Sequence, residues 1–272
     1  MKKVLLVLLG LALIMTGTWG CAEENGVLRV GTLNATWSYD SYLEHFEKYH
    51  SGGDQNIPAE YIRYDSLSSL LLALESGNIQ LAGVSLCTAR YIAEHNDRFD
   101  YAVANVAEGN AQNFHMLTLE ENQEIFNLLN DAIIEMKQDG TLELLKEKYI
   151  DHFDESSAQT ITLPRFEDGQ TVRVAVTGDI PPMDYVSADM MGAGFNIALL
   201  SEIASRKNVN FELVTVDTTA RFLALSTQRV DAVFWCVDLM CEEHDVVWNE
   251  NTEGMLLTEA YFSDVVARLW KK

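Results

Sequence analysis

The sequence has 272 residues, of which 48% are hydrophobic and 22% are charged, and its formal net charge at pH 7 is −22. A chain of this length can bury the core of one large domain or of two lobes of ordinary size. Because so acidic a surface repels the phosphates of nucleic acids and anionic lipid headgroups, the charge excludes DNA, RNA and peripheral membrane partners.

The N-terminus has the three parts of a bacterial secretory signal. Met1-Lys2-Lys3 supplies positive charge, and residues 4–15 form an almost unbroken apolar run. The run is shorter than the roughly 20 apolar residues of a membrane-spanning helix, so it indicates a signal peptide over residues 1–20. Gly20-Cys21 then resembles a lipobox, and we predict that Cys21 is the lipidated first residue of the mature chain. The alternative is an ordinary secretory signal followed by a coincidental cysteine.

The next part of the chain alternates between strand and helix patterns. Strands are expected over residues 28–32, 59–64 and 79–84, and a first helix over residues 38–50. A second helix should begin at the Asp65-Ser66 cap and run through Leu74. Gly77 should end that helix.

A second unit of the same kind occurs later in the chain. It consists of a strand over residues 212–216, a cap at Asp217-Thr218, a helix over residues 220–225 and a strand over residues 230–235. The segment ALESGNIQLAGV (73–84) aligns with ALSTQRVDAVFW (224–235) at a constant offset of 151 residues. Apolar strands joined by helices suit parallel sheets covered on both faces, so the repeat predicts two similar α/β lobes.

A helical block lies between the two units. Apolar residues recur at helical spacing within residues 120–139, and Gly140 should end that helix. Thr141 is expected to cap a second helix over residues 142–150. After an exposed connector, the segment VRVAVTGDIPPMDY (172–185) predicts a strand followed by a proline turn, and residues 195–207 predict an amphipathic helix.

These segments together resemble the extracytoplasmic solute-binding proteins of polar amino-acid ABC transporters (family 3), which have the type 2 periplasmic binding fold. VRVAVTGDIPPMDYVSADMMGAGFNIALLSEIA (172–204) resembles the start of that family's first lobe, and LLTEAYFSDVV (256–266) resembles the segment that leaves it. AIIEMKQDGTLELLKEKYI (132–150) resembles the family's C-terminal helix pair. The resemblance implies an α/β protein with two Rossmann-like lobes joined by a hinge.

The order of the segments differs from that of the family. Residues 26–110 resemble the second lobe, and residues 111–272 resemble the first lobe, entered through its C-terminal helices. We therefore predict a circularly permuted monomer, in which residues 154–170 link the old termini and residues 261–270 pair as a C-terminal hinge strand. The alternative is a truncated tandem fusion completed by a partner chain in a swapped dimer.

The resemblance places the ligand between the lobes, at the carboxyl ends of the strands. The candidate ligand-binding residues are Thr36, Trp37, Ser85, Asp179, Trp235, Cys236 and Asp238. The family position of Thr36 implies that its hydroxyl and amide receive a carboxylate, while Trp235 could stack on a ligand and an aspartate could hold a cationic group. Helix capping and core packing remain open as purely structural roles for these residues, as they do for Tyr185.

The family's amino-acid clamp does not carry over to this sequence. Glu243 aligns with the arginine that pairs the ligand carboxylate, and an acid cannot donate the bidentate hydrogen bonds of a guanidinium. Ser85 replaces the acid for the ligand ammonium, and Ile180 and Thr218 replace the two aromatic residues that sandwich the ligand. The resemblance still implies capture of a small polar solute, amino acid-like or amine-containing, for an ABC permease. The alternative is a ligand sensor or interaction module with a degenerate cleft.

No cofactor, metal or catalytic chemistry is expected. The four cysteines lack zinc-binding spacing, and a disulfide between Cys236 and Cys241 is left open because only geometry decides it. Cys241 and His244 are too near in sequence to face each other as a catalytic pair. We expect a non-enzymatic, extracytoplasmic protein that contacts the bacterial membrane only through its N-terminal lipid anchor.

Overall fold

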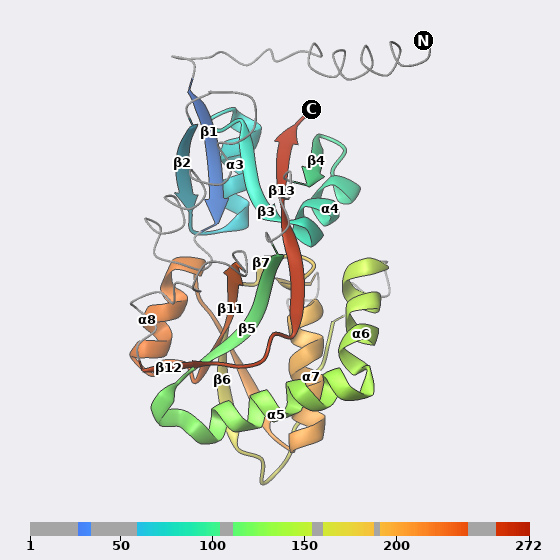
Figure 1. Cartoon of the computed structure of the whole chain (residues 1–272), viewed down its shortest axis with the longest axis vertical. Coiled ribbons are helices and arrows are strands. Elements are labelled where there is room, and N and C mark those ends of the chain that lie inside the picture. The colour runs from blue at the N-terminus through green and yellow to red at the C-terminus, as the bar shows by residue number, and fades with distance from the viewer. Residues whose placement is uncertain (1–26, 34–58, 104–110, 154–159, 188–190, 239–253) are drawn as a thin grey trace, which may run out of the picture.

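The computed structural model describes residues 27–33, 59–103, 111–153, 160–187, 191–238 and 254–272. Two sheets lie one above the other in Figure 1, each with its own helices, and we call these groups the upper and the lower lobe. The upper lobe contains β1 (Leu28–Leu33), β2 (Ala59–Tyr64), α3 (Leu67–Ser76), β3 (Leu81–Ser85), α4 (Leu86–His95) and β4 (Phe99–Val103).

The lower lobe begins with a long strand and a helical block and continues through the repeated unit. Its first elements are β5 (Ala111–Leu119), η1 (Glu120–Asn122), α5 (Gln123–Asp139), α6 (Thr141–Lys146) and the π-helical turn η2 (Glu147–Asp151). The next are β6 (Thr171–Val176), β7 (Asp179–Ile180), β8 (Asp184–Val186), β9 (Gly192–Ala193) and α7 (Phe195–Lys207). The last are β10 (Asn210–Thr215), η3 (Thr218–Ala220), α8 (Arg221–Ser226), β11 (Ala232–Asp238) and β12 (Met255–Leu257).

The two repeated β-α-β units have the same strand arrangement. In the upper lobe β1 lies between β2 and β3, and all three strands are parallel. In the lower lobe β6 lies in the same way between β10 and β11, again in parallel. The predicted fold class, two Rossmann-like α/β lobes with a hinge, is therefore confirmed.

The C-terminal strand β13 (Phe262–Lys271) pairs with strands of both lobes. Its first half, Phe262–Val265, runs antiparallel to β5, and its second half pairs with β3 on one side and β4 on the other. Figure 1 shows it as the long red arrow that rises from the lower lobe into the upper one. The two sheets are thus joined through β13 into one ten-stranded sheet of order β10-β6-β11-β5-β13-β3-β1-β2, with β12 beside β5 and β4 beside β13. The repeated units lie on either side of the β5–β13 pair in this sheet.

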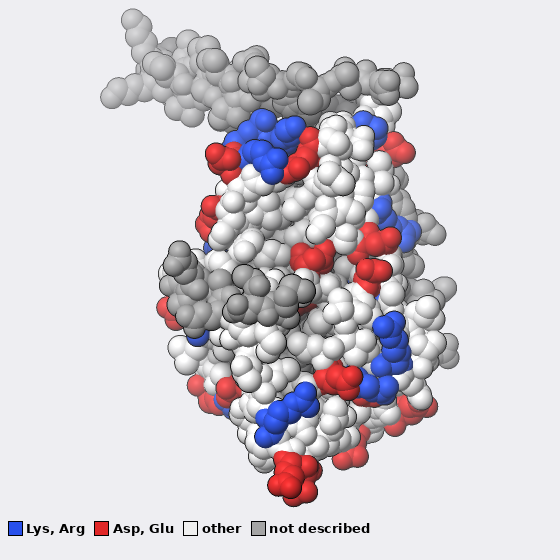
Figure 2. Space-filling model, turned by 180° about the vertical axis from the view of Figure 1, so that it is seen from behind, with Lys and Arg blue, Asp and Glu red and all other residues white. Residues whose placement is uncertain are grey.

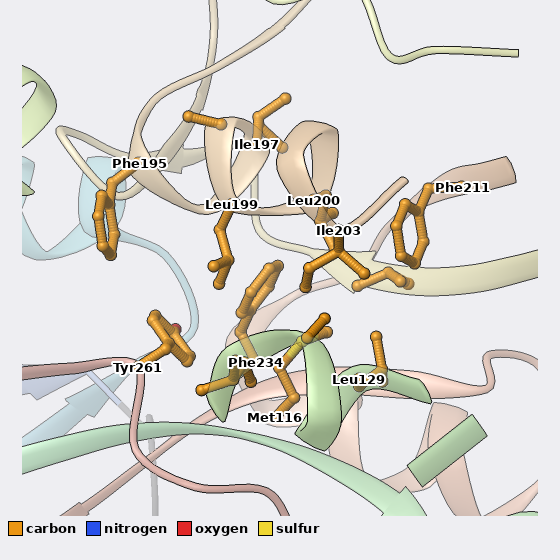
Figure 3. Packing of buried hydrophobic residues seen from close by; sticks show 14 of the residues in the cluster. Met116, Leu129, Phe195, Ile197, Leu199, Leu200, Ile203, Phe211, Phe234 and Tyr261 are labelled. Carbon is orange, nitrogen blue, oxygen red and sulfur yellow. The ribbon is translucent and has the colours of Figure 1, made fainter. Parts of the chain in front are cut away.

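Each lobe has its own hydrophobic core. Successive residues of a strand point to opposite faces of the sheet, so Met116 packs under α5 and α7 while Leu117 packs on the α8 side. Figure 3 shows the larger core, in which Leu199 and Ile203 of α7 point toward Met116 and Phe234 of the lower sheet. The upper core, built mainly from α3, β3, α4 and β13, is a separate cluster.

Most of the predicted element boundaries are close to the observed ones, and one cap is wrong. Gly77 and Gly140 end α3 and α5 with φ angles of 77° and 82°, which favour glycine. Thr141, predicted as a cap, is instead the first residue of α6. The turn at Gly140 lets the Asp139 carboxylate accept the Thr141 N–H at 3.0 Å, so the acid takes the capping role.

Several sequence predictions lie outside the described residues. These are the signal peptide over residues 1–20, Cys21, the helix over residues 38–50 and part of the connector at 154–170. Within the described ranges, every helix is too short or too polar to cross a bilayer.

Candidate functional site

The carboxyl ends of parallel strands from both lobes meet at one junction. In the upper lobe β3 ends at Ser85, whose partner in β13 is Val266. The preceding residue, Val265, already pairs with β5 of the lower lobe. From the lower lobe, the chain after β6 reaches α3 through Asp179, and the chain after β10 reaches the start of α3 through Thr218. In α/β proteins this is where ligands bind.

A buried carboxylate holds the loop that carries Asp179. Asp184 accepts hydrogen bonds from the Thr177 amide at 2.8 Å, the Thr177 hydroxyl at 2.6 Å and the Gly178 amide at 2.9 Å. Its other oxygen accepts the side-chain amide of Asn196, in the first turn of α7, at 2.8 Å. Four donors on one buried acid fix the path from β6 into the β7–β8 hairpin, where Asp179 lies opposite Tyr185.

On one side of the junction the lower lobe contacts the start of α3. Oδ2 of Asp179 accepts the Ser68 N–H at 3.4 Å. Burial raises the pKa of Asp179, as do the Asp184 and Asp217 carboxylates, while the amides at the start of α3 oppose the shift. Beside it, the Thr218 hydroxyl and amide both donate to the Asp65 carbonyl, at 2.7 and 3.3 Å.

On the other side the upper lobe contacts η2 and the β8 strand through α4. Arg90 donates to the Ile150 carbonyl, and the Tyr91 ring meets the Phe153 ring edge-on at 4.7 Å between centroids. The ring of Tyr185 lies 6.3 Å from that of Tyr91. The hydroxyl of Tyr185 is buried and has no hydrogen-bond partner among the described residues. Burial, with a contribution from Tyr91 and Tyr149, raises the pKa of Tyr185 to about 12.

The strand β13 is connected to the same helix. Asp264 of β13 accepts the Cys87 N–H at 2.8 Å, in the first turn of α4. Burial raises the pKa of Asp264 and raises that of the Cys87 thiol well above its ordinary value, the second shift being enlarged by the Asp264 carboxylate. The crossing point of β13 is therefore joined to α4 by a partly buried acid.

The structure brings together some of the predicted site residues. Asp179 lies at the junction, and Ser85 lies at the end of β3, where it is the N-cap residue of α4. The backbones of Trp235, Cys236 and Asp238 belong to β11 and pair with β5, but their side chains lie outside the description. Thr36, Trp37, Cys241 and Glu243 also lie outside the described residues.

The two residues that the resemblance aligns with aromatic residues of the family, Ile180 and Thr218, serve here as contacts between the lobes. Ile180 packs against the cores of both lobes, and Thr218 bonds to the start of α3. Neither contact needs a ligand between the two lobes.

Other residues of the junction had no sequence signal. Arg90, Tyr91 and Asp264 become neighbours of the site only because α4 packs beside β13. Arg221 is a buried cation in α8 that donates to the Phe234 carbonyl of β11 at 2.8 Å. No group of acidic, histidine and cysteine side chains suited to a metal occurs among the described residues.

Two α/β lobes whose strand ends meet at a hinge have the architecture of the type 2 periplasmic binding fold. Residues 172–242 match the family of bacterial extracellular solute-binding proteins, family 3, which confirms the resemblance for about a quarter of the chain. The family is one of binding proteins, and its members are typically extracytoplasmic. A search of curated protein sequences finds no match.

Solved structures of similar fold have low sequence identity to this chain. A ligand-binding component of an ABC-type import system from Staphylococcus aureus, with zinc bound, is 12% identical with a TM-score of 0.45, covering 89% of this chain and 66% of that one. The chain thus spans just under two thirds of that protein's length. The ancestral amino acid-binding protein AncCDT-1 is 11% identical with a TM-score of 0.46, covering 92% and 83%. The VFT2 domain of Bordetella pertussis BvgS is 14% identical with a TM-score of 0.44, covering 91% and 82%.

Proposed function

We propose that the protein is an extracytoplasmic, lipid-anchored solute-binding protein that captures a small polar solute between its lobes and delivers it to an ABC permease. The family match of residues 172–242 supports the class. The junction supports the location of the site, because strand ends from both lobes and the β7–β8 hairpin meet there. The protein acts by binding and closure rather than by catalysis.

Asp179 and Tyr185 are the residues that we propose contact the solute. These residues lie opposite each other in the β7–β8 hairpin and face different parts of the upper lobe. A carboxylate can pair with an ammonium group, and aromatic faces attract cations. The Tyr185 hydroxyl adds a buried group with no hydrogen-bond partner among the described residues. An amine-containing solute, such as an amino acid with a cationic group, satisfies all three features.

We also propose that the order of the lobes along the chain is circularly permuted relative to the family. Residues 26–110 would form the family's second lobe and residues 111–272 its first lobe, with 154–170 as the permutation linker. The matching arrangements β2-β1-β3 and β10-β6-β11 support the equivalence of the two units. Within residues 261–270, β13 supplies a hinge strand held by hydrogen bonds, which supports a monomer over a swapped dimer.

We also propose that the N-terminus directs export of the protein. Residues 1–20 would be removed as a lipoprotein signal, and Cys21 would carry the lipid. A disulfide between Cys236 and Cys241 would be compatible with that location. Neither nucleic acid nor a cofactor is expected as a partner.

A thermal-shift experiment with the exported chain tests the solute. The panel is cationic, neutral and acidic amino acids, short amines and short peptides. A bound compound at 100 times its Kd should stabilise the protein by about 2.7 kcal/mol. The amines should raise the melting temperature, and Asp179→Asn and Tyr185→Phe should reduce that rise. Asp97→Asn, which changes an exposed acid after α4, is the matched control.

One observation favours a second function. The resemblance aligns Glu243, one residue beyond the matched segment 172–242, with the family's carboxylate-binding arginine. Such a replacement is expected of a sensor or interaction module whose cleft has lost the original ligand. If no compound of the panel raises the melting temperature, this second function replaces solute transport.

A further inference from the structure

The two lobes are joined at the start of α3 by a contact between a charge and a helix end. The first amides of a helix have no partner within the helix and carry a partial positive charge. The first turn of α3 has no acidic residue of its own. Asp179, from the lower lobe, provides the negative charge instead and accepts the Ser68 N–H at 3.4 Å.

A contact of opposite polarity lies at α4. The last carbonyls of a helix carry a partial negative charge, and cations bind them. Arg90, from the upper lobe, donates to the Ile150 carbonyl near the end of the α6–η2 helical segment of the lower lobe. The Asp151 carboxylate lies 3.8 Å from the same guanidinium, but it is already paired at 3.1 Å with Lys146 of its own lobe. The carbonyl is therefore the principal partner of Arg90.

The two contacts lie on either side of the β7–β8 hairpin. Asp179 is in β7 and contacts α3, while Tyr185 in β8 faces Tyr91, the neighbour of Arg90 in α4. An uncharged contact between the lobes lies close to each charge. Thr218 bonds to Asp65 near Asp179, and Tyr91 packs against Phe153 near Arg90. Each lobe thus presents one charge to a helix end of the other.

We infer that Asp179 and Arg90 are reciprocal latches that favour the closed arrangement of the lobes through protein contacts alone. Opening the junction separates both charges from their helix ends, whereas the hinge pairing of β13 can persist. A solute would then bind a protein whose lobes already attract each other. This inference concerns the protein without solute, so its failure would leave the proposed transport function standing.

Small-angle scattering of the full exported chain without solute tests the latches. The wild type should have a radius of gyration near the roughly 18 Å of a compact chain of about 250 residues. The double variant Asp179→Ala/Arg90→Ala should have a larger radius. Charge contacts at helix ends are modest, so the double variant should shift the opening equilibrium by roughly tenfold and each single variant by less.

Hydrogen exchange provides a local measurement in the same variants. The amides in the first turn of α3 should exchange faster in Asp179→Ala, and the segment around η2 should do so in Arg90→Ala. The matched controls are Asp139→Ala and Arg98→Ala, because each of these residues has an ion pair of 2.7 Å inside a single lobe. The controls should scatter like the wild type.

Two results would overturn the inference. In the first, the wild type already has the larger radius of an open protein. In the second, the double variant is indistinguishable from the wild type and the controls in both scattering and exchange.

Discussion

Asn196 donates a hydrogen bond from Nδ2 to Oδ2 of Asp184 at 2.8 Å, and both side chains are buried. The oxygen of the same Asn196 amide accepts the Tyr261 hydroxyl at 3.2 Å. Tyr261 immediately precedes β13, so the loop that positions Asp179 is linked through α7 to the start of β13. The loop that carries Asp179 and the start of β13 therefore share one hydrogen-bond network.

The first prediction concerns this network. Asp184→Ala removes the acceptor of four hydrogen bonds, and a buried donor left without a partner costs about 1–3 kcal/mol. We expect the free energy of unfolding, measured by urea titration, to fall by at least about 3 kcal/mol. Asp184→Asn should lose less because it keeps one acceptor oxygen. Asp97→Ala, at an exposed site, should change stability by less than about 0.5 kcal/mol, and an equal loss in both alanine variants would contradict the prediction.

The second prediction concerns the C-terminal strand. Leu269 is completely buried in the upper core, so Leu269→Ala should destabilise the protein by about 2–5 kcal/mol. Native-state hydrogen exchange should show the largest loss of protection in β3 and β4, the strands that β13 pairs with there. Leu144→Ala, at a residue with 65% exposure, is the control. Loss of protection confined to the lower lobe would show that the upper sheet does not depend on β13.

The third prediction concerns pH. Burial raises the pKa of Asp264 above its ordinary value of 3.8, so its protonated form suits the fold better. The contribution of Asp264 to the free energy of unfolding is complete at pH values below its ordinary pKa. It is lost as pH rises through the raised pKa of the folded protein. Asp264→Asn, which does not titrate, should therefore gain stability relative to the wild type between pH 3 and pH 7. Denaturant titrations across that range measure this difference.

Asp139 provides a control of opposite sign for the pH experiment. Hydrogen bonds from Thr141 and Arg206 lower the pKa of Asp139 from 3.8 to about 2. The contribution of Asp139 to the free energy of unfolding is present at pH values above its ordinary pKa. It is lost as pH falls toward 2. Asp139→Asn should therefore approach wild-type stability in acid. The stability difference from the wild type should change with pH in opposite directions for the two asparagine variants. A change in the same direction would show that the two carboxylates are not in the different environments described.

The fourth prediction concerns Cys87. Its thiol is buried and its pKa is raised well above the ordinary value, so little of the reactive thiolate forms in the folded protein. Iodoacetamide at pH 8 should leave Cys87 unmodified in the native protein and label it fully in urea. Peptide mass mapping separates Cys87 from the other cysteines. Rapid labelling of Cys87 under native conditions would place the first turn of α4 in contact with solvent.

Local features of the sequence predicted the elements of the fold well. The range predicted for α7, residues 195–207, is the observed one, and Gly77 and Gly140 end their helices as expected. The two segments that align at an offset of 151 residues predicted two similar units, and these units share one strand arrangement. These features follow from side-chain periodicity and backbone preference, which act over a few residues.

The candidate site was predictable only in part. The position of Asp179 after β6 placed it at a strand end, where ligands of α/β proteins bind. Its contact with Ser68 joins residues 111 positions apart, and that of Cys87 with Asp264 joins residues 177 apart. Such pairs have no periodic signal, because each residue alone fits a cap, a turn or a strand.

The amino-acid sequence by itself determined the net charge of −22, the helices and strands and the presence of two similar α/β units, since these depend on composition and on neighbours along the chain. It did not place the charges, and on the face drawn in Figure 2 basic side chains lie among acidic ones. Only the tertiary structure decided that β13 joins both sheets and that Asp179 and Arg90 each reach a helix end of the opposite lobe. Those contacts depend on how the two hydrophobic cores are set against each other. Hydrogen bonds and charges between distant segments fix that arrangement.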